Sequence, residues 1–246
     1  MNKRVLFVIP YLYEGGAQRA LSNIEMHFPD DWEIETLVNS EYKKTFPVKG
    51  KVHTLGINQK PRTSSPIFQF RVFLMRIKVL RQLKKSGNYD ACISFSDSAS
   101  VANILTGKKY CRTIVSVRTS LISSNKLPKY KYIVTPLARL LYNYADKVVA
   151  VSEELKNELI YELDLKKNKV LAIPNGYDVV RIHELSAEPI DEVIADKIKG
   201  KKVICNIGRL SIPKGQGHLI RSFKKVHEVL PDAVLLIWGK ASWKAT

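Results

Sequence analysis

The chain has 246 residues, enough for one large domain or two modest ones. Apolar residues make up 45% and charged residues 26%, which is typical of a folded globular protein and excludes long disorder. Lysine and arginine number 40 against 23 aspartates and glutamates, and the net charge of +17 points to phosphate, nucleic acid or an anionic membrane surface.

The amino terminus predicts a β-strand over residues 5–9. Lys3 and Arg4 precede it as in a signal peptide, but the apolar stretch ends at Pro10 without a small-residue cleavage site. The longest apolar run, 233–238, is far shorter than the ~20 residues needed to span a bilayer. We therefore expect a protein that is neither secreted nor transmembrane.

The turn after this strand contains Gly15 and Gly16, followed by Arg19. Two glycines let a backbone approach an anion closely, and the helix predicted over 17–27 presents free amides and its positive dipole end. The turn is either a phosphate-contacting loop or a plain tight turn with a surface arginine. It lacks the spacing G-x-G-x-x-G, so a nicotinamide cofactor is not favoured.

A helix predicted over 66–85 lies in the most basic region of the chain, since residues 60–131 hold 15 basic residues against Asp90 and Asp97. At 100° per residue, four cations of this helix form one stripe: Arg71, Lys78, Arg81 and Lys85. Apolar residues occupy more than half of the circumference. This predicts either burial between two neighbouring elements or contact with an anionic membrane, where each nearby cation contributes roughly 1 kcal/mol.

Strands and helices alternate through the rest of the chain. Further strands are predicted at 34–38, 91–95, 113–117, 147–151, 170–173, 203–207 and 233–238, and further helices at 136–144, 153–161 and 217–230. This alternation predicts an α/β fold, a Rossmann-like parallel sheet with helices on both faces. Such sheets bind ligands at the carboxyl ends of their strands.

The polar segment 184–200 contains Pro189 and separates two strand–helix patterns, so it is the predicted linker. It would divide an amino-terminal domain, 1–183, from a smaller carboxyl-terminal one, 201–246. Three cysteines, Cys92, Cys111 and Cys205, are odd in number and far apart. They favour neither a disulfide framework nor a zinc site, and a reducing cytoplasm fits best.

The strand predicted at 203–207 leads into a second candidate turn, with Gly208, Arg209, Lys214 and Gly215 before a helix. Arg209 can fork onto two phosphate oxygens, and Lys214 supplies a point charge. Beside a helix amino terminus, these residues predict a diphosphate cradle, although solvated cations flanking a turn remain the alternative. The segment lacks the spacing G-x-x-x-x-G-K-[ST] of a Walker phosphate-binding loop.

Four segments in order resemble family 4 glycosyltransferases of the GT-B fold. They are E-G-G-A-Q-R at 14–19, A-D-K-V-V-A-V-S-E at 145–153, P-N-G-Y-D at 174–178, and G-R-L-x-x-x-K-G-x-x-x-L-I-x-S-F at 208–223. The resemblance implies a retaining transfer of a sugar from a nucleotide diphosphate donor, in a cleft between two Rossmann-like domains.

The resemblance also implies roles for individual residues. Gly208, Arg209, Lys214 and Gly215 would bind the donor diphosphate of a UDP-sugar or GDP-sugar. The first loop, Gly15, Gly16 and Arg19, would contact donor phosphates or acceptor, while Asn175 and Gly176 would lie on the hinge or nucleotide side. No metal or other cofactor is expected, because the chain contains no Asp-x-Asp triplet.

Arg118 follows the strand predicted at 113–117, near the place where many members of the family carry a histidine beside the transferred sugar. It is therefore a candidate catalytic or acceptor-phosphate residue; the alternative is one more cation in a basic region.

The end of the chain departs from the family pattern. The family's second domain continues and carries a Glu-x7-Glu element that grips the donor, whereas Glu154 and Glu162 match that spacing only by coincidence. Residues 240–246 match no family segment, and a premature stop or a shifted reading frame near Lys240 would explain both observations.

Two functions remain open from the sequence. The first is a glycosyltransferase of surface polysaccharide synthesis, cytoplasmic and peripheral on the inner face of the membrane, with a glycan or lipid-linked acceptor. The second is a catalytically dead fragment that binds acceptor, anionic membrane or nucleic acid. No helix-turn-helix, RNP-type strand or zinc spacing appears, so a specific nucleic-acid partner is not expected.

Overall fold

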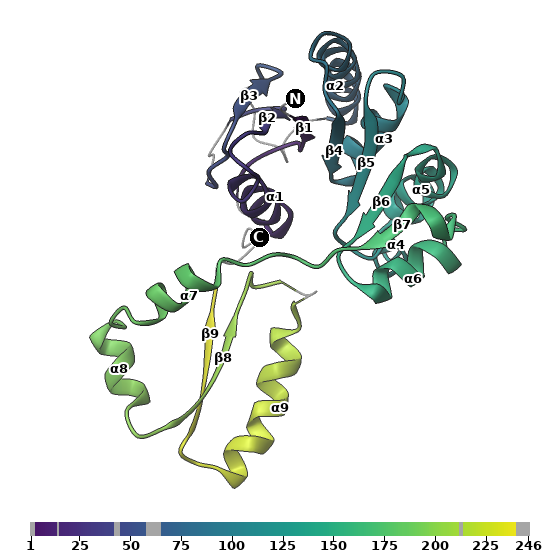
Figure 1. Cartoon of the computed structure of the whole chain (residues 1–246). Helices are drawn as coiled ribbons and strands as arrows, with labels where there is room; N and C mark the ends of the chain where they lie inside the picture. Colours follow the sequence, from purple (N-terminus) through teal and green to yellow (C-terminus); the bar gives the residue numbers. More distant parts are fainter. Residues whose placement is uncertain (1–2, 14, 42–44, 58–64, 212–213, 240–246) are drawn as a thin grey trace. The chain divides into compact units, whose positions relative to one another are not determined.

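The computed structural model describes residues 3–13, 15–41, 45–57, 65–211 and 214–239. The chain divides into two compact units, unit 1 over 1–178 and unit 2 over 179–246 (Figure 1). The segment 184–200, predicted as a linker, holds the end of one helix and the whole of another and belongs to unit 2.

Unit 1 is built on a seven-stranded sheet in the order β3-β2-β1-β4-β5-β6-β7, and every pair in it is parallel. The strands are β1 Arg4–Val8, β2 Glu33–Val38, β3 Lys51–Thr54, β4 Ala91–Phe95, β5 Arg112–Val117, β6 Lys147–Ala150 and β7 Val170–Ala172. The chain runs outward from β1 to β3 and then returns to β4, so the direction of winding changes between β1 and β4. In sheets of this kind, ligands bind at that switch point.

Helices and short turns connect these strands. They are α1 Gly16–Met26, α2 Pro66–Ser86, α3 Asp97–Leu105, α4 Leu121–Ser124, the π-helix η1 Tyr130–Val134, α5 Thr135–Leu141, α6 Glu153–Tyr161, and the 3-10 turns η2 Tyr142–Tyr144 and η3 Lys167–Lys169. The α/β, Rossmann-like class predicted from the alternating pattern is confirmed.

The two faces of β1 pack into different parts of the core. Val5 and Phe7 join Leu21 of α1, while Leu6 and Val8 join Val72 of α2. Burial on both faces explains why β1 reads as a continuous apolar run rather than an alternating one. A third cluster, around Val115 and Leu159, completes the core under α5 and α6.

The helix α2 buries two cations along with its apolar residues. Val72, Arg76, Leu80 and Lys84 recur every four residues and form its buried face. The Arg76 guanidinium donates from Nε and Nη2 to Asn39 Oδ1, at 3.1 and 2.9 Å, and from Nη1 to Ser98 Oγ at 3.1 Å. Lys84 Nζ donates to the carbonyl oxygens of Asn103 and Gly107, at 2.9 and 3.2 Å.

Both cations are thus held by neutral oxygens, and burial lowers the pKa of Arg76 to about 10. The pattern of apolar residues alone did not predict that two cations lie on the inner face.

Unit 2 contains the parallel pair β8 Lys202–Ile207 and β9 Ala233–Trp238, with the helices α7 Val179–Ser186, α8 Glu192–Ile198 and α9 Gln216–Val229. The carbonyl oxygen of Gly208 lies 1.8 Å from the position that a Cβ on Gly239 would occupy. Gly239 therefore allows the ends of β8 and β9 to approach each other closely.

The observed elements differ from the predicted ones in two ways. Strands 91–95 and 233–238 and helix 153–161 have the predicted bounds, and the other predicted elements shift by a few residues at their ends. The strand β3, the helices α3, α4, α7 and α8, and the short elements η1 and η3 were not predicted. β3 is a short edge strand with only partial burial, and α3 begins with the polar segment Asp97-Ser98, so neither has a clear apolar period.

Among the residues that the structure describes, no helix is long and apolar enough to cross a membrane.

The buried ammonium of Lys84 supplies the first test of the fold. Lys84→Ala leaves the carbonyl oxygens of Asn103 and Gly107 without their donor and opens a cavity, so we expect a loss of about 2–3 kcal/mol in the free energy of unfolding. Urea unfolding followed by circular dichroism measures it. Lys85→Ala, at the adjacent exposed position, is the control and should change the value by less than about 0.5 kcal/mol. Equal values for the two variants would contradict the structural role of Lys84.

Candidate functional site

The turns after the strands of unit 1 meet at the carboxyl edge of its sheet. Three sequence-predicted segments lie there: the glycine turn after β1, Arg118 after β5, and Asn175 with Gly176 after β7. A fourth segment, Ser96 to Ser98 after β4, was not predicted and lies at the switch point.

The glycine turn leads directly into α1. Gly15 precedes the helix with an extended backbone, at φ 166° and ψ 155°, and a Cβ on Gly16 would meet no atom within 4 Å. The first turn of α1 itself contains no acidic residue that would compete for its amides. Arg19 is exposed, and its guanidinium lies 5.0 Å from the centre of the Phe46 ring.

Arg118 and Asn175, singled out separately in the sequence, contact each other. Arg118 Nη2 donates to Asn175 Oδ1, and Nη1 donates to Ser116 Oγ at 3.3 Å. The guanidinium carbon lies 5.4 Å from the centre of the Phe95 ring. Partial burial lowers the pKa of Arg118, but an arginine remains charged at neutral pH. These contacts fix a cation at the carboxyl edge, with both terminal guanidinium nitrogens donating to neutral oxygens.

Gly176 is held from another direction. Asn23 of α1 donates from Nδ2 to the carbonyl oxygen of Gly176 at 3.1 Å. The segment after β7 is therefore tied to α1 through Gly176 and to the turn after β5 through Asn175.

Ser96 is the residue that sequence reasoning missed. Its backbone has φ 91° and ψ 150°, a region that is essentially restricted to glycine, and its Oγ is buried without a hydrogen-bond partner among the described residues. The other non-glycine residues described with positive φ, Asn88 at 48° and Asp164 at 55°, lie in the left-handed region that Asn and Asp tolerate. Strain of this kind clusters at functional sites, and no local sequence signal identifies it.

Asp97 follows Ser96 as the first residue of α3. Burial raises the pKa of its carboxyl group, while a hydrogen bond from the Tyr130 hydroxyl and the charge of Lys129 act in the opposite direction. Asp97 thus links the carboxyl end of β4 to the π-helix η1, far along the chain.

In unit 2, the turn after β8 brings the second set of predicted residues together. Gly208 follows β8, and its N–H donates to the carbonyl oxygen of Trp238 at 2.9 Å. Lys214 Cδ lies 4.0 Å from the position of a Cβ on Gly208, so the lysine side chain passes over this glycine. Arg209 and Lys214 are exposed, and neither makes an ion pair with a described carboxylate.

Gly215 and Gln216 shape this turn. Gly215 has φ 70° and ψ 15°, a left-handed conformation that glycine adopts without strain, and it precedes α9. Gln216 Nε2 donates to the carbonyl oxygen of Arg209 at 3.1 Å, and its Oε1 accepts from the N–H of Ser211 at 3.4 Å. The first turn of α9 contains no acidic residue. Two exposed cations at a helix amino terminus suit an anionic group such as a diphosphate.

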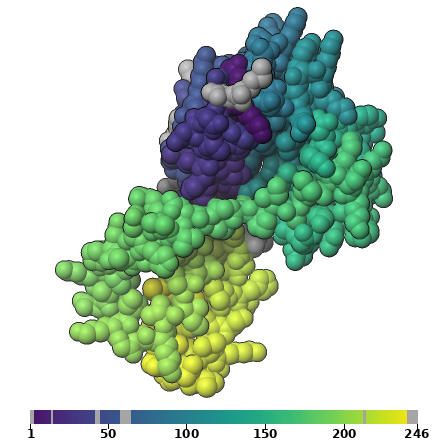
Figure 2. Space-filling model, viewed as in Figure 1, coloured from purple at the N-terminus to yellow at the C-terminus, as the bar shows by residue number. Residues whose placement is uncertain are grey.

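The remaining predicted site residues lie on α2. Arg71, Lys78, Arg81 and Lys85 are all exposed, and so are four apolar residues of the same helix, Ile67, Phe70, Leu74 and Met75. The space-filling view shows α2 at the surface of unit 1 (Figure 2).

Among the described residues, no group of three or more His, Cys, Asp or Glu side chains is arranged to hold a metal ion. The residues predicted to follow a shifted reading frame, 240–246, lie outside the described residues.

Comparison with known sequences decides the family. The sequence profile described as Glycosyltransferase Family 4 matches residues 15–181, more than half of the chain. The chain belongs to Glycosyltransferase Family 4. A relative in Methanocaldococcus jannaschii, the uncharacterized glycosyltransferase MJ1059, is 34% identical over 232 residues, which cover 87% of this chain and 57% of that protein. The family identified from the four sequence segments is thereby confirmed.

Solved structures share the fold. Alr3699/HepE of Anabaena, solved in complex with UDP and glucose, matches with a TM-score of 0.67 at 18% identity, over 97% of this chain and 61% of that one. A glycosyltransferase from Rickettsia africae matches with a TM-score of 0.61 at 17% identity, over 97% of this chain and 60% of that one. The chain thus has the GT-B type of α/β architecture and spans about three fifths of the length of these family and fold relatives.

The strained Ser96 supplies a test of the site. Because glycine adopts φ 91° without strain, Ser96→Gly should raise the free energy of unfolding by about 1 kcal/mol, whereas Ser96→Ala keeps the strain and should not raise it. Thermal and urea unfolding measure the difference.

Asn88→Gly is the matched control, since Asn already tolerates its left-handed backbone, and it should change stability by less than about 0.5 kcal/mol. A Ser96→Gly variant no more stable than Ser96→Ala would show that the turn is not strained.

Proposed function

We propose that this family 4 protein is a retaining glycosyltransferase that moves a sugar from a nucleoside diphosphate donor to a glycan or lipid-linked acceptor in surface polysaccharide synthesis. The observation that carries the proposal is the turn of Gly208, Arg209, Lys214 and Gly215 at the amino terminus of α9, where two cations without an ion pair to any described carboxylate lie beside the first amides of the helix. The family resemblance supports retention of anomeric configuration and the polysaccharide role.

In this proposal the turn after β8 acts on the leaving group. When the bond between the sugar and the diphosphate breaks, negative charge develops on the diphosphate oxygens. Arg209 and Lys214 would stabilise that charge, and the amides at the start of α9 would add hydrogen bonds. UDP-sugars and GDP-sugars are the proposed donors, and HepE with its bound UDP and glucose supports a nucleotide-sugar partner.

Arg118 is the proposed catalytic residue of unit 1. Its guanidinium is positioned by Asn175, Ser116 and the Phe95 ring, which limits the rotamer freedom it must lose when a substrate binds. A fixed cation at the carboxyl edge of the sheet suits a donor or acceptor phosphate oxygen. Gly15, Gly16 and Arg19 would contact the same substrates from the turn after β1. Asn23 of α1 holds the segment after β7 through Gly176.

A second candidate function is binding without transfer, by unit 1 acting as an acceptor-binding or membrane-binding module. The exposed residues of α2 favour its membrane form, because this helix exposes large apolar side chains in its first half and cations mainly in its second half.

Nucleotide titration tests the proposed transferase. Isothermal titration of the full chain with UDP, GDP and ADP should show binding of one of them, and Arg209→Ala and Lys214→Ala should each weaken it by at least about tenfold, because each removes a charge-assisted hydrogen bond. Lys225→Ala, an exposed lysine further along α9, is the control and should leave the affinity within about twofold. If none of the three nucleotides binds, the transferase proposal fails.

Arg118→Lys separates the catalytic role from binding. We expect it to lower the rate of sugar transfer by about a hundredfold while nucleotide affinity stays within about threefold, because lysine cannot reproduce the held fork. A transfer assay with the nucleotide-sugar of the nucleotide that binds, with product configuration determined by NMR, measures both rate and retention. An unchanged rate would remove Arg118 from the catalytic machinery.

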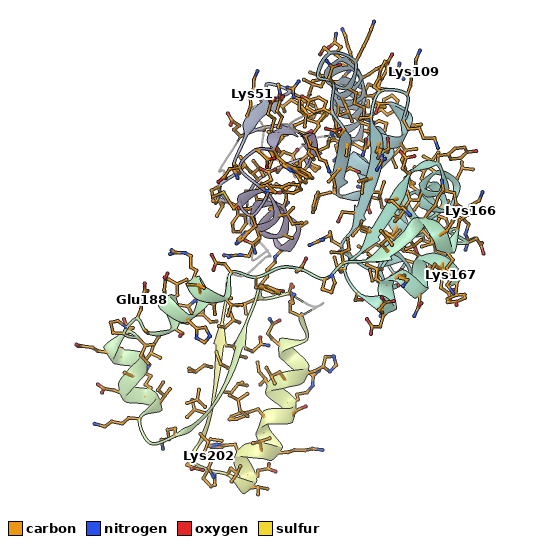
Figure 3. All side chains as sticks on the ribbon, viewed as in Figure 1. Lys51, Lys109, Lys166, Lys167, Glu188 and Lys202 are labelled. Atoms are coloured by element: carbon orange, nitrogen blue, oxygen red, sulfur yellow. The ribbon has the colours of Figure 1, made fainter. Side chains whose placement is uncertain are left out.

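Vesicle binding tests the membrane contact of α2. A variant with Arg71, Lys78, Arg81 and Lys85 all replaced by Gln should lose most of its binding to vesicles with anionic lipid, since each cation near the surface contributes about 1 kcal/mol. Co-sedimentation at fixed ionic strength measures the bound fraction. Replacing Lys51, Lys166, Lys167 and Lys202, which project from the ribbon elsewhere (Figure 3), makes a control with the same net charge. Equal loss in both variants would show a general charge effect and not a surface on α2.

A further inference from the structure

Unit 1 contains a groove that the preceding sites do not use. It has a volume of about 530 Å³ and is lined by residues of α4, η1, α5 and the turn after α4: Ile122, Asn125, Lys131, Thr135, Pro136, Arg139 and Leu140. Its volume lies within the range of small-molecule sites, ~300–1,000 Å³. The helix α4 begins three residues after Arg118, so the groove adjoins the carboxyl edge of β5.

One part of the groove lining is polar and cationic. Lys131 is exposed, its Nζ lies 5.3 Å from the centre of the Tyr132 ring, and it makes no ion pair with a described carboxylate. Arg139 is also exposed, with its Nε 3.6 Å from Asp164 Oδ2 and its Nη2 donating to the carbonyl oxygen of Glu162. Among the described residues, Asp164 is the only carboxylate that forms an ion pair with a residue lining the groove.

Two further polar residues, Thr135 and Asn125, line the groove. Thr135 is buried, and its hydroxyl donates to Asn125 Oδ1 at 2.7 Å, whereas the amide nitrogen of Asn125 makes no hydrogen bond with a described residue. No acidic residue occurs in the sequence between Asp97 and Asp146, although this stretch contains eight basic residues: Lys108, Lys109, Arg112, Arg118, Lys126, Lys129, Lys131 and Arg139. The charge around the groove is thus suited to an anion.

The other part of the lining is apolar and continues onto the open surface. Ile122, Pro136 and Leu140 line the groove, and Leu140 is 64% exposed. Tyr132, Ile133 and Leu137, on the same helical segment, are also exposed. These four exposed large apolar side chains lie within nine residues of the chain, and exposed apolar groups that gather on a protein surface often mark binding sites.

We propose that this groove binds a phosphate ester that carries an apolar chain, with the phosphate at Lys131 and Asn125 and the chain along Ile122, Pro136 and Leu140. A free phosphate would leave the apolar wall uncovered, and a neutral amphiphile would leave the cation and the amide unpaired. The proposal rests on the proposed function, because it assigns the lipid-linked class to the acceptor and places it beside the turn of Arg118.

Titration of the full chain with three monomeric probes tests the proposal. Decyl phosphate should bind, and inorganic phosphate and decyl maltoside should each bind at least about tenfold more weakly, because each offers only one of the two chemistries. Equal affinity for decyl phosphate and inorganic phosphate would overturn the apolar half of the site. Equal affinity for decyl phosphate and decyl maltoside would overturn the anionic half.

Two variants at exposed positions locate the site without disturbing the core. Lys131→Ala and Leu140→Asn should each weaken decyl phosphate binding by about tenfold. Lys109→Ala is the matched control for the first, because Lys109 lies over the Tyr110 ring as Lys131 lies over Tyr132 and projects outward elsewhere on unit 1 (Figure 3). Leu105→Asn, at a partly exposed leucine that ends α3, is the control for the second. If the controls weaken binding as much as the groove variants, the proposed location is wrong.

Arg209→Ala separates this proposal from the proposed function. This variant should lose nucleotide binding and keep decyl phosphate binding unchanged. Nucleotide binding with no binding of decyl phosphate would leave the transferase in place and overturn the groove. Decyl phosphate binding that Lys131→Ala weakens, with no nucleotide bound, would support the groove and overturn the transferase. Loss of decyl phosphate binding in Arg209→Ala would place the anion in unit 2 and overturn the groove.

Discussion

The parallel pairing of all seven strands of unit 1 is the constraint on which the rest of this unit depends. Because neighbouring strands run the same way, every connection must cross back over a face of the sheet, and all carboxyl ends lie at one edge. Residues distant in the chain, such as Arg118 and Asn175, are thereby brought within hydrogen-bonding distance. The same constraint brings the strained Ser96 to the edge beside β1, where the winding changes direction.

The helix α2 shows how this architecture places charge inside a protein. Its buried face carries Arg76 and Lys84: Arg76 donates to Asn39 after β2 and to Ser98 at the start of α3, and Lys84 donates to Asn103 near the end of α3. Neutral oxygens satisfy both cations, so the helix is fixed by directional hydrogen bonds as well as by Val72 and Leu80. Its outer face exposes cations and large apolar side chains, on which the proposed membrane contact depends.

The excess of positive charge has several local uses in the proposed function. In unit 2, Arg209 and Lys214 flank a helix amino terminus, a setting for a leaving diphosphate. In unit 1, Arg118 is held over the Phe95 ring, and Lys131 borders an amphiphilic groove. In the proposed reaction a sugar passes from a nucleotide-sugar to a phosphate-bearing acceptor and the nucleoside diphosphate leaves, so both substrates require cations, and each unit would supply its own.

The sequence by itself determined the α/β class, the family and the positions of most strands and helices. Continuous apolar runs, glycine turns and the segment 208–223 are local patterns, and they can be recognised in the sequence without knowledge of the tertiary structure. Tertiary structure alone decided which residues meet. The bond between Arg118 and Asn175 and the burial of Lys84 depend on strand order and helix orientation, which no residue spacing encodes. The strain at Ser96 also came only from the structure, because serine does not favour this backbone conformation and the residue joins β4 directly to α3.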